Sequence, residues 1–203
     1  MTTLSLHNHQ VKLENNFTTP AFTFTVNQGE HVLIAGRNRA GKSLLIAALA
    51  GRGRPLAGSR TCEVSVAEVS VAVQQALILE EKQKDSADLL DIVAEPTLVH
   101  ELLSQANPDY IQHNAYEALS TALQVTHLLN TAFLSLSTGE TRKVLLLLAW
   151  VSNADVILID EPFEGLDKEA RARFNTFLSQ QTQSTLVITA NTVRDVPNVA
   201  CKL

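Results

Sequence analysis

The sequence predicts an α/β fold with a mainly parallel sheet, an antiparallel β layer and an inserted helical subdomain. Nearly uninterrupted apolar runs at 156–159 and 186–189 are typical of buried parallel strands, and they alternate with helical segments. Between residues 74 and 133 the apolar residues take helical spacing, and strand signals almost disappear. We therefore expect one domain of 203 residues, with a core from about 1–73 and 134–203 and a helical subdomain from about 74–133.

The N-terminal part carries mostly strand signals, because apolar and β-branched residues alternate there with polar ones. Strands are expected at 4–6, 11–13, 22–26, 63–66 and 69–73. The stretch 51–59 contains several Gly residues and a Pro, so it predicts turns. The first of these strands are expected to form the antiparallel layer.

Helical spacing dominates the rest of the chain. Helices are expected at 86–93, 97–105, 110–125, 138–151 and 168–180. Pro96 and Pro108 lie near the starts of two of them, where proline is tolerated. The inner turns of the helix at 138–151 are apolar all round, which predicts burial on most sides. The charged residues 80–85 are expected to form a solvated surface.

Residues 36–43, GRNRAGKS, fit the pattern G-x-x-x-x-G-K-[ST] between an apolar strand at 31–35 and a helix. Backbone N–H groups of such a loop and the positive end of the helix dipole bind phosphate. Lys42 is expected to reach the β- and γ-phosphates and the Ser43 hydroxyl to ligate Mg²⁺. The sequence therefore predicts a P-loop NTPase. Its nucleotide-binding residues are expected to be Gly36, Arg37, Asn38, Arg39, Ala40, Gly41, Lys42 and Ser43.

Two carboxylates follow the apolar run at 156–159. Asp160 would lie at the carboxyl end of a parallel strand and hold the metal through water. Glu161 would point elsewhere and polarise a water molecule for in-line attack on the γ-phosphate. The alternative is that Glu161 merely caps the strand end.

The order of the motifs resembles that of ATP-binding cassette (ABC) ATPases. LSTGE at 136–140 is similar to their signature loop, and EGLD at 164–167 is similar to a turn that crosses their dimer interface at Asp167. The resemblance covers nearly the whole chain and implies Mg²⁺-dependent ATP hydrolysis by two paired cassettes, each completing the other's site. The implied signature residues, acting in trans, are Leu136, Ser137, Thr138, Gly139 and Glu140.

LSTGETRK at 136–143 and DEPFEGLD at 160–167 are most similar to the soluble tandem-cassette proteins of the molybdenum-transport or photorepair (ModF) type, and to their first cassette. This resemblance implies a second cassette, as a homodimer or a tandem half, together with a membrane subunit and a role in transport. The chain stops at Leu203, earlier than cassettes usually do, so it is either a short protein or a fragment of a longer one.

The sequence departs from the family pattern inside the phosphate loop and at the switch position. Arg39 stands where cassettes commonly have glycine, and Arg37 and Arg39 either add positive charge near the phosphates or face solvent. Asn191 aligns with the family's switch histidine, which makes it a candidate catalytic residue. Asn donates a hydrogen bond but carries no charge, so we expect slow hydrolysis.

Two further departures concern the adenine and the metal. Val11 falls near the expected adenine-stacking position, with His9 and Phe17 as neighbours, and no aromatic residue is well placed there. We therefore expect weak affinity for the base. The glutamine that contacts the metal in the family should follow the strand ending at Val73; Gln74 and Gln75 are both available, and we prefer Gln75.

The composition restricts the remaining function classes. A net charge of −5 and an aromatic content of 5% disfavour a nucleic-acid surface. The cysteines Cys62 and Cys201 have no metal-binding spacing, and no apolar run approaches the ~18–20 residues of a membrane span. We expect a cytoplasmic protein, peripheral in any membrane role. Two functions stay open: an ATPase, and a nucleotide-gated interaction module that hardly hydrolyses ATP.

Overall fold

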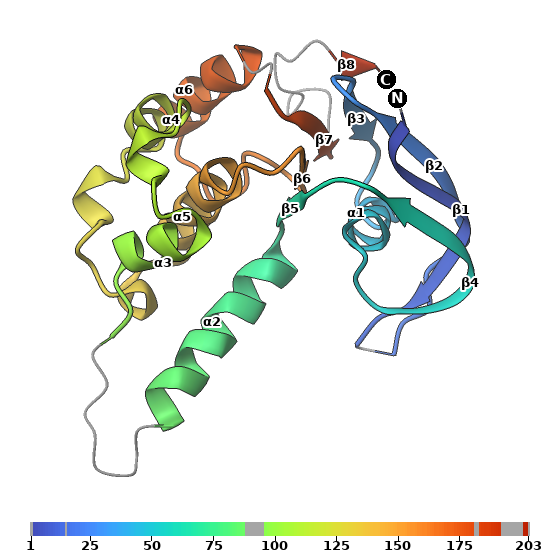
Figure 1. Ribbon diagram of the computed structural model, residues 1–203, viewed down its shortest axis with the longest axis horizontal. Helices are drawn as coiled ribbons and strands as arrows, with labels where there is room; N and C mark the ends of the chain where they lie inside the picture. Colours follow the sequence, from blue (N-terminus) through green and yellow to red (C-terminus); the bar gives the residue numbers. More distant parts are fainter. Residues whose placement is uncertain (1, 15, 88–95, 181–182, 192–200, 203) are drawn as a thin grey trace. The chain divides into compact units, whose positions relative to one another are not determined.

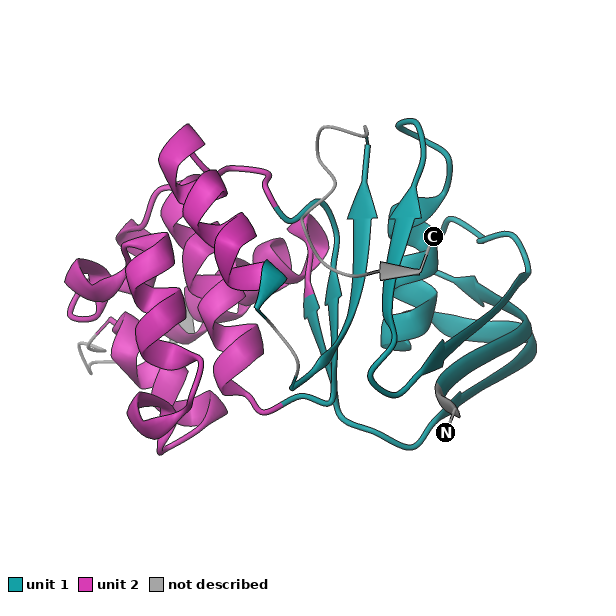
Figure 2. Cartoon of the chain, turned by 90° about the horizontal axis from the view of Figure 1, so that it is seen from above, with its two compact units in different colours: residues 1–68, 154–162, 179–203 teal, residues 69–153, 163–178 magenta. Residues whose placement is uncertain are grey.

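The computed structural model describes residues 2–14, 16–87, 96–180, 183–191 and 201–202. The chain forms two compact units (Figure 2). Unit 1 comprises residues 1–68, 154–162 and 179–203, and unit 2 comprises residues 69–153 and 163–178. These boundaries differ from the expected ones, since the segments 138–151 and 168–178 belong to unit 2 together with the inserted helices.

The antiparallel layer of unit 1 is built around a single long strand, β1 (Thr2–Lys12), between β2 (Phe22–Asn27) and β4 (Arg54–Cys62) (Figure 1). The short strand expected at 4–6 and residues 11–12 of the one expected at 11–13 are parts of β1. The sequence hides this continuity because β1 is bulged, with register shifts after Leu6 and at Gln10 and a left-handed Asn8 (φ 46°).

The turns expected at 51–59 were wrong for most of that stretch, because β4 begins at Arg54. Pro55 is tolerated there since β4 lies at the edge of its sheet. Gly58 has φ 68°, and a Cβ at this position would meet the carbonyl oxygens of His7 and Asn8. The glycine therefore accommodates the β1 bulge rather than a turn.

The second sheet of unit 1 has the order β5-β6-β7-β3-β8. Its strands are β5 (Val66–Val69), β6 (Val156–Ile159), β7 (Thr185–Ala190), β3 (His31–Ala35) and β8 (Cys201–Lys202). The pairs β3–β7, β6–β7 and β3–β8 are parallel, which confirms the mainly parallel sheet. The strands expected at 31–35 and 156–159 are confirmed, and the one expected at 186–189 lies within β7.

Helix α1 (Lys42–Ala50) contacts both β1 and β6, and it joins the two sheets of unit 1 through one apolar core. Its Ile46 and Leu49 are fully buried, together with Leu4 and Leu6 of β1 and Leu158 of β6. The core thus holds the segment before α1, the phosphate loop, against the ends of the parallel strands.

Unit 2 is helical. Its elements are α2 (Val71–Ala87), α3 (Val99–Ala106), η1 (Tyr110–Gln112), α4 (Tyr116–Leu123), η2 (Thr126–Leu128), η3 (Phe133–Ser135), α5 (Thr138–Val151) and α6 (Lys168–Ser179). Helix α5 packs against α3 and α4, which explains why it belongs to this unit. Trp150 makes edge contacts with Phe174 and Phe177, and these rings join α5 to α6.

Several expectations for unit 2 need correction. The strand at 69–73 was wrong, because β5 ends at Val69 and α2 begins at Val71. The helix at 110–125 is broken near His113, whose Nδ1 accepts a hydrogen bond from the Ala115 N–H. The helix at 86–93 falls mostly on residues 88–95, outside the described residues.

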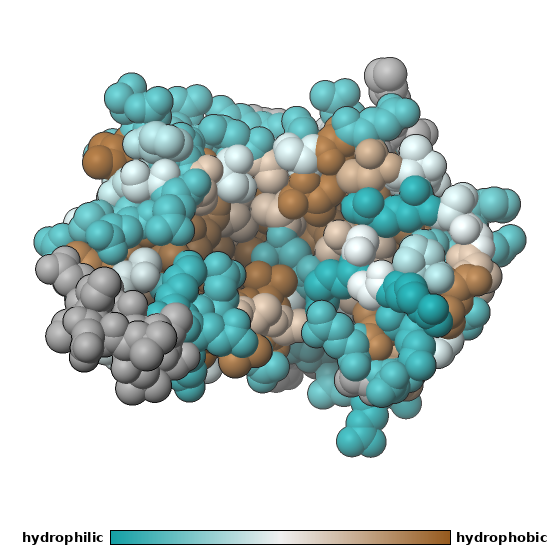
Figure 3. Space-filling view, turned by 60° about the horizontal axis from the view of Figure 1, so that its bottom comes forward, coloured by the Kyte–Doolittle hydropathy of each residue, from teal (hydrophilic) through white to brown (hydrophobic). Residues whose placement is uncertain are grey.

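Few of the large apolar side chains that the structure describes are exposed, and the face in Figure 3 carries both hydrophobic and hydrophilic residues. The expected solvated surface at 80–85 was only partly right, because Glu81 is buried and its Oε1 lies 2.6 Å from Lys84 Nζ. Within the described ranges, no helix combines the length and apolarity needed to cross a membrane.

Candidate functional site

The phosphate loop connects β3 to α1, as expected. Gly41 is the N-cap of α1 with φ 93°, and its carbonyl accepts the first helical hydrogen bond from Leu45 N–H. Arg39 also has a left-handed backbone, with φ 69°. That conformation costs a non-glycine residue about 1–3 kcal/mol and costs glycine almost nothing, which is a physical reason for the glycine that cassettes commonly carry there.

Lys42 is 7% exposed and its ammonium group is held by three acceptors. Its Nζ donates to the carbonyl oxygens of Gly36 (2.9 Å) and Arg37 (3.1 Å) and to Asn191 Oδ1 (2.7 Å). These bonds use all three N–H donors of the ammonium group. The structure thus brings together two predicted site residues that lie 149 positions apart.

Asp160 and Glu161 follow β6 and are bound by a residue that the sequence analysis missed. Thr189 of β7 donates from Oγ1 to Asp160 Oδ1 (2.6 Å) and accepts at Oγ1 from the Glu161 N–H (3.0 Å). Glu161 has φ 55°, a left-handed conformation. The available signal was a hydroxyl residue in a mostly apolar, buried strand, because such a group needs hydrogen-bond partners.

A cavity of about 430 Å³ lies in unit 1 at this place. It is lined by Phe17, Asn38, Arg39, Gly41, Lys42, Ser43, Leu44, Glu161 and Asn191. Arg37 and Arg39 are both exposed, and of the two only Arg39 is part of this lining. Predicted residues from the phosphate loop, the end of β6 and the end of β7 share one hollow.

Phe17 bears on the expectation that no aromatic residue is well placed to stack on adenine. The Phe17 side chain is 49% exposed and lines the cavity. Val11, at the position suggested by the family pattern, is buried in the apolar core of the β layer. The segment after β1 thus supplies the aromatic ring that β1 itself lacks.

The residues near the cavity suit a magnesium ion. The hydroxyl of Ser43 and the carboxylate of Asp160 are hard oxygen donors, which Mg²⁺ prefers. Among the residues that the structure describes, no group of three or more His, Cys, Asp or Glu residues could hold a metal by itself. Mg²⁺ usually needs only one or two carboxylates beside phosphate oxygens and waters, so this donor set fits it.

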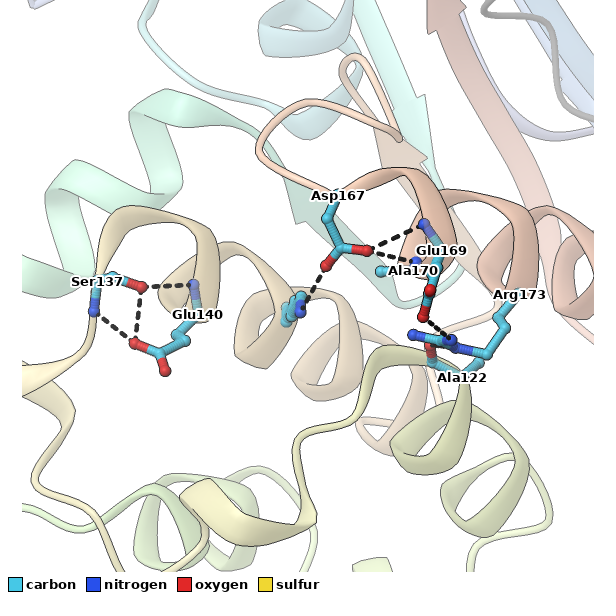
Figure 4. A network of polar contacts seen from close by, with 8 residues as sticks. Ala122, Ser137, Glu140, Asp167, Glu169, Ala170 and Arg173 are labelled. Carbon is cyan, nitrogen blue, oxygen red and sulfur yellow. Dashed lines mark hydrogen bonds and ion pairs between the residues drawn. The ribbon is translucent and has the colours of Figure 1, made fainter.

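The signature residues 136–140 begin helix α5 in unit 2. Ser137 is the N-cap, and it forms a capping box with Glu140 (Figure 4). Glu140 Oε2 accepts from Ser137 N–H (2.8 Å) and from Ser137 Oγ (2.6 Å), and Ser137 Oγ accepts from Glu140 N–H (3.3 Å). The Ser137 hydroxyl bond, followed by the Ser137 N–H bond, lowers the pKa of Glu140.

The turn at 164–167 lies against the same helix within unit 2. A Cβ at Gly139 would approach the Gly165 carbonyl oxygen to 3.0 Å, so glycine permits this contact. Asp167 caps α6, since its Oδ1 accepts from the N–H groups of Glu169 (3.0 Å) and Ala170 (2.8 Å), and its Oδ2 lies 3.5 Å from Lys143 Nζ (Figure 4). The Ala170 bond is the main cause of the lowered pKa of Asp167.

Gln74 and Gln75 both lie in α2, so the strand expected to end at Val73 just before them was wrong. The Gln74 side chain is buried, at 5% exposure, and its Nε2 donates to the Thr138 carbonyl oxygen at 3.2 Å. Gln75, the preferred candidate for the metal, is exposed. Within unit 2, Gln74 is therefore the glutamine that contacts the signature segment.

Together the fold and the cavity define a P-loop nucleotide-binding protein. Residues 20–164 match the family model described as ABC transporter, and the chain belongs to this family of ATPases. It is 32% identical over 205 residues to the ABC transporter ATP-binding protein ModF of Escherichia coli (strain K12), an alignment that covers 97% of this chain and 41% of ModF. The expected family and fold class are thereby confirmed.

Two other relatives are named for import systems. The thiamine import ATP-binding protein ThiQ of Escherichia coli (strain K12) is 27% identical over 188 residues, which cover 89% of this chain and 78% of ThiQ. The zinc import ATP-binding protein ZnuC of Psychrobacter arcticus is 29% identical over 151 residues, which cover 74% of this chain and 56% of ZnuC. The chain thus spans less than two thirds of both ModF and ZnuC.

Solved structures agree with this fold. A structure titled RNase-L Inhibitor matches with a TM-score of 0.75 at 23% identity, covering 98% of this chain and 36% of that one. The ATP binding subunit of an ABC transporter matches with a TM-score of 0.70 at 19% identity, covering 95% of this chain and 80% of that one. At such identities the likeness shows the fold alone.

Proposed function

We propose that this chain is a cassette that binds ATP with Mg²⁺ in unit 1 and hydrolyses it when it pairs with a second cassette. The observation that carries the proposal is the cavity in unit 1 that the phosphate loop, Glu161 and Asn191 line together. Each group there has a chemistry that triphosphate hydrolysis needs: a lysine cation, backbone N–H donors, a hydroxyl and carboxylates.

Lys42 binds the phosphates by exchanging acceptors. Its ammonium group is already taken out of bulk water by three oxygen acceptors, so little desolvation remains when ATP enters. Phosphate oxygens carry more negative charge than the Asn191 amide oxygen, and charge-assisted hydrogen bonds are the stronger ones. Lys42 therefore turns from Asn191 toward the β- and γ-phosphates.

Ser43 and Asp160 would hold Mg²⁺, which when bound neutralises charge on the phosphate oxygens. Glu161 acts as the general base: its carboxylate, at the wall of the same cavity, accepts the proton of the attacking water. Asn191, once released by Lys42, donates from its amide to a γ-phosphate oxygen. Since Asn191 carries no charge, it stabilises the developing negative charge weakly, and turnover is slow.

Phe17 is the stacking partner for the adenine base. Its half-exposed ring at the cavity wall offers a surface on which adenine stacks, a contact worth about 1–3 kcal/mol in other base-binding proteins. Stacking on a ring face depends little on which base is bound. We therefore expect a real but unselective contribution to nucleotide affinity.

The second cassette supplies the opposite wall of the site. The start of α5 offers the Ser137 hydroxyl, N–H groups around Gly139 and the positive helix end to a phosphate across a dimer. This partner is a second copy of the chain or a second cassette on the same polypeptide; the 41% coverage of ModF supports the latter. We propose that the pair acts in transport at the cytoplasmic face of the membrane, together with membrane subunits.

The cargo belongs to those other subunits, because relatives of this cassette are named for thiamine and for zinc import. A molybdate system is one candidate, and its support is the likeness to ModF. Transport assays of a strain lacking this chain, with molybdate, zinc and thiamine as alternative cargoes, would separate these roles. Unchanged uptake of molybdate would remove that candidate.

The test of hydrolysis compares the wild type with Lys42→Ala and Glu161→Gln. Lys42→Ala should weaken ATP binding at least about tenfold, because a charged hydrogen-bond donor is lost. Glu161→Gln should keep ATP binding and lower kcat at least about 100-fold, since the general base is lost. Phosphate release and fluorescent-ATP binding measure these effects. Equal background rates for all three proteins would refute the ATPase.

The 2.7 Å bond between Lys42 and the uncharged Asn191 favours a second candidate, a nucleotide-gated interaction module with very slow turnover. In that case ATP should produce stable dimers in size-exclusion chromatography even with Glu161 intact. Rapid phosphate release without such dimers would contradict this candidate and support the first.

A further inference from the structure

Thr189 and Ala190, the last two residues of β7, and Asn191 directly after the strand contact both the phosphate loop and the acidic pair of unit 1. The Thr189 side chain bonds Asp160 and the backbone of Glu161, the Ala190 carbonyl accepts from Gly36 N–H (3.1 Å), and Asn191 Oδ1 accepts from Lys42. Among these, the contacts of Ala190 and Asn191 concern the phosphate loop. Thr189 reaches the acidic pair.

The Thr189 hydroxyl is buried and held in a fixed position between Asp160 and Glu161. Its side chain is 0% exposed, so water cannot replace the hydroxyl. The backbone around it is fixed, because β7 pairs with β6 through Ile188 and with β3 through Thr189 itself. A hydroxyl has one donor and accepts at the same oxygen, and here the donor serves Asp160 while the acceptor serves Glu161.

Glu161 needs such support. Its left-handed backbone (φ 55°) is unfavourable for a residue with a Cβ, and such conformations persist only where neighbouring groups hold them. The Thr189 hydroxyl is one such group, because its Oγ1 accepts a hydrogen bond from the Glu161 N–H. The same hydroxyl fixes one oxygen of the Asp160 carboxylate, and thereby the direction in which that carboxylate faces.

We propose that Thr189 is a positioning residue for the acidic pair: its hydroxyl orients the Asp160 carboxylate for the metal and holds Glu161 in its left-handed conformation for water activation. The roles of Asp160 and Glu161 in this inference rest on the function proposed above. The purely structural alternative is a buried hydroxyl that only satisfies its neighbours.

Thr189→Val tests the inference, because valine has nearly the same shape and no hydroxyl. Thr185→Val is the matched control: Thr185 is also buried in β7, at the other end, and its Oγ1 accepts from Gly29 N–H (2.8 Å). Thr189→Ser keeps the hydroxyl and should restore wild-type behaviour. Should Thr189→Val not fold, Thr189→Ala removes the same hydroxyl.

Binding of Mn²⁺, as a paramagnetic probe, is measured by electron paramagnetic resonance with a non-hydrolysable ATP analogue. Thr189→Val should weaken Mn²⁺ binding about tenfold and lower kcat about tenfold or more, the size expected for a lost hydrogen bond to a charged group. Nucleotide binding in EDTA should stay within about twofold, since the phosphate loop keeps its contacts. Thr185→Val should change neither Mn²⁺ binding nor kcat.

The outcomes separate this inference from the proposed ATPase. If the wild type hydrolyses no ATP, the proposed ATPase activity is refuted. Mn²⁺ binding that is weakened in Thr189→Val and not in Thr185→Val would still support the inference. Equal Mn²⁺ binding by Thr189→Val and Thr185→Val overturns it. Loss of nucleotide binding in EDTA by Thr189→Val and by Thr189→Ser alike also overturns it, because it shows a structural role.

Discussion

The two units build their candidate sites in different ways. In unit 1 the decisive contacts join distant segments: Lys42 and Asn191 are 149 positions apart, and Asp160 and Thr189 are 29 apart. In unit 2 the signature side is mostly local, since Ser137 and Glu140 are three positions apart and Asp167 bonds the next turn of its own helix. The unit 1 site therefore depends on the sheet, whereas the unit 2 site depends on helix caps.

This difference predicts separable defects. A change in the unit 2 segment should leave nucleotide binding by unit 1 intact and affect only steps that need the partner's signature. A change in the sheet contacts of unit 1 should affect binding or catalysis directly. The predictions below probe that separation, and they are ordered from the largest expected effect to the smallest.

The first prediction concerns Gly139. In Gly139→Ala the new Cβ would lie 3.0 Å from the Gly165 carbonyl oxygen, so the start of α5 and the turn at 164–167 must move apart. Turnover should fall at least about tenfold, because a displaced signature misplaces its phosphate donors. Nucleotide binding by isolated monomers should be unchanged. If isolated Gly139→Ala monomers also lost nucleotide binding, measured by fluorescence, the functions of the two units would not be separable.

The second prediction concerns Asn191 in unit 1. Asn191→His introduces a group that titrates near pH 6.5, where asparagine does not titrate. We expect turnover to rise several-fold at pH 6, where the imidazolium stabilises phosphate charge, and to fall back toward the wild-type rate as the pH rises to 8. A pH–rate profile of the variant parallel to that of the wild type would contradict the position assigned to Asn191.

The third prediction concerns stability in unit 1. Ser65 donates to Asp155 Oδ2 from Oγ (2.6 Å) and from N–H (2.9 Å), and the Oγ bond is the main cause of the lowered pKa of Asp155. A carboxyl with a lowered pKa in the folded state contributes stability above its ordinary pKa, and this contribution is lost as the pH falls. Because both residues are exposed and solvent screens their interaction, Ser65→Ala should cost only about 0.5 kcal/mol at pH 7 and less near pH 3.

Thermal denaturation of the wild type and Ser65→Ala at both pH values measures this effect. Ser152→Ala is a suitable control, because the Ser152 hydroxyl donates to the Ala149 carbonyl and not to a carboxylate. Its effect on the melting temperature should not depend on pH. A constant difference between Ser65→Ala and the wild type across pH would show that Asp155 does not supply the stability.

The sequence predicts features made by contiguous residues better than contacts between distant segments. The phosphate loop, the signature cap and β6 are read from contiguous residues, and their elements were expected correctly. Thr189 was missed because its partners are set by strand pairing. Phe17 was named only as a neighbour of the expected adenine position, because the path of the chain after β1 is not encoded by a local pattern. The strand β4 was missed because Gly58 and Pro55 resemble turn residues unless the bulge of β1 is known.

The last and smallest effect is expected at Lys143. Its ion pair with Asp167 is long, at 3.5 Å, and the Asp167 side chain is 59% exposed, so water and salt screen it. Asp167 also keeps its two backbone bonds at the start of α6 when Lys143 is changed. Lys143→Met should therefore leave the melting temperature unchanged at 150 mM salt, whereas Asp167→Ala should lower it through the lost cap. The contrary result would be that Lys143→Met lowers stability and ATP-dependent pairing as much as Asp167→Ala does. The ion pair with α5, and not the cap of α6, would then hold the turn at 164–167. In that case the signature side of unit 2 would also depend on contacts between distant segments.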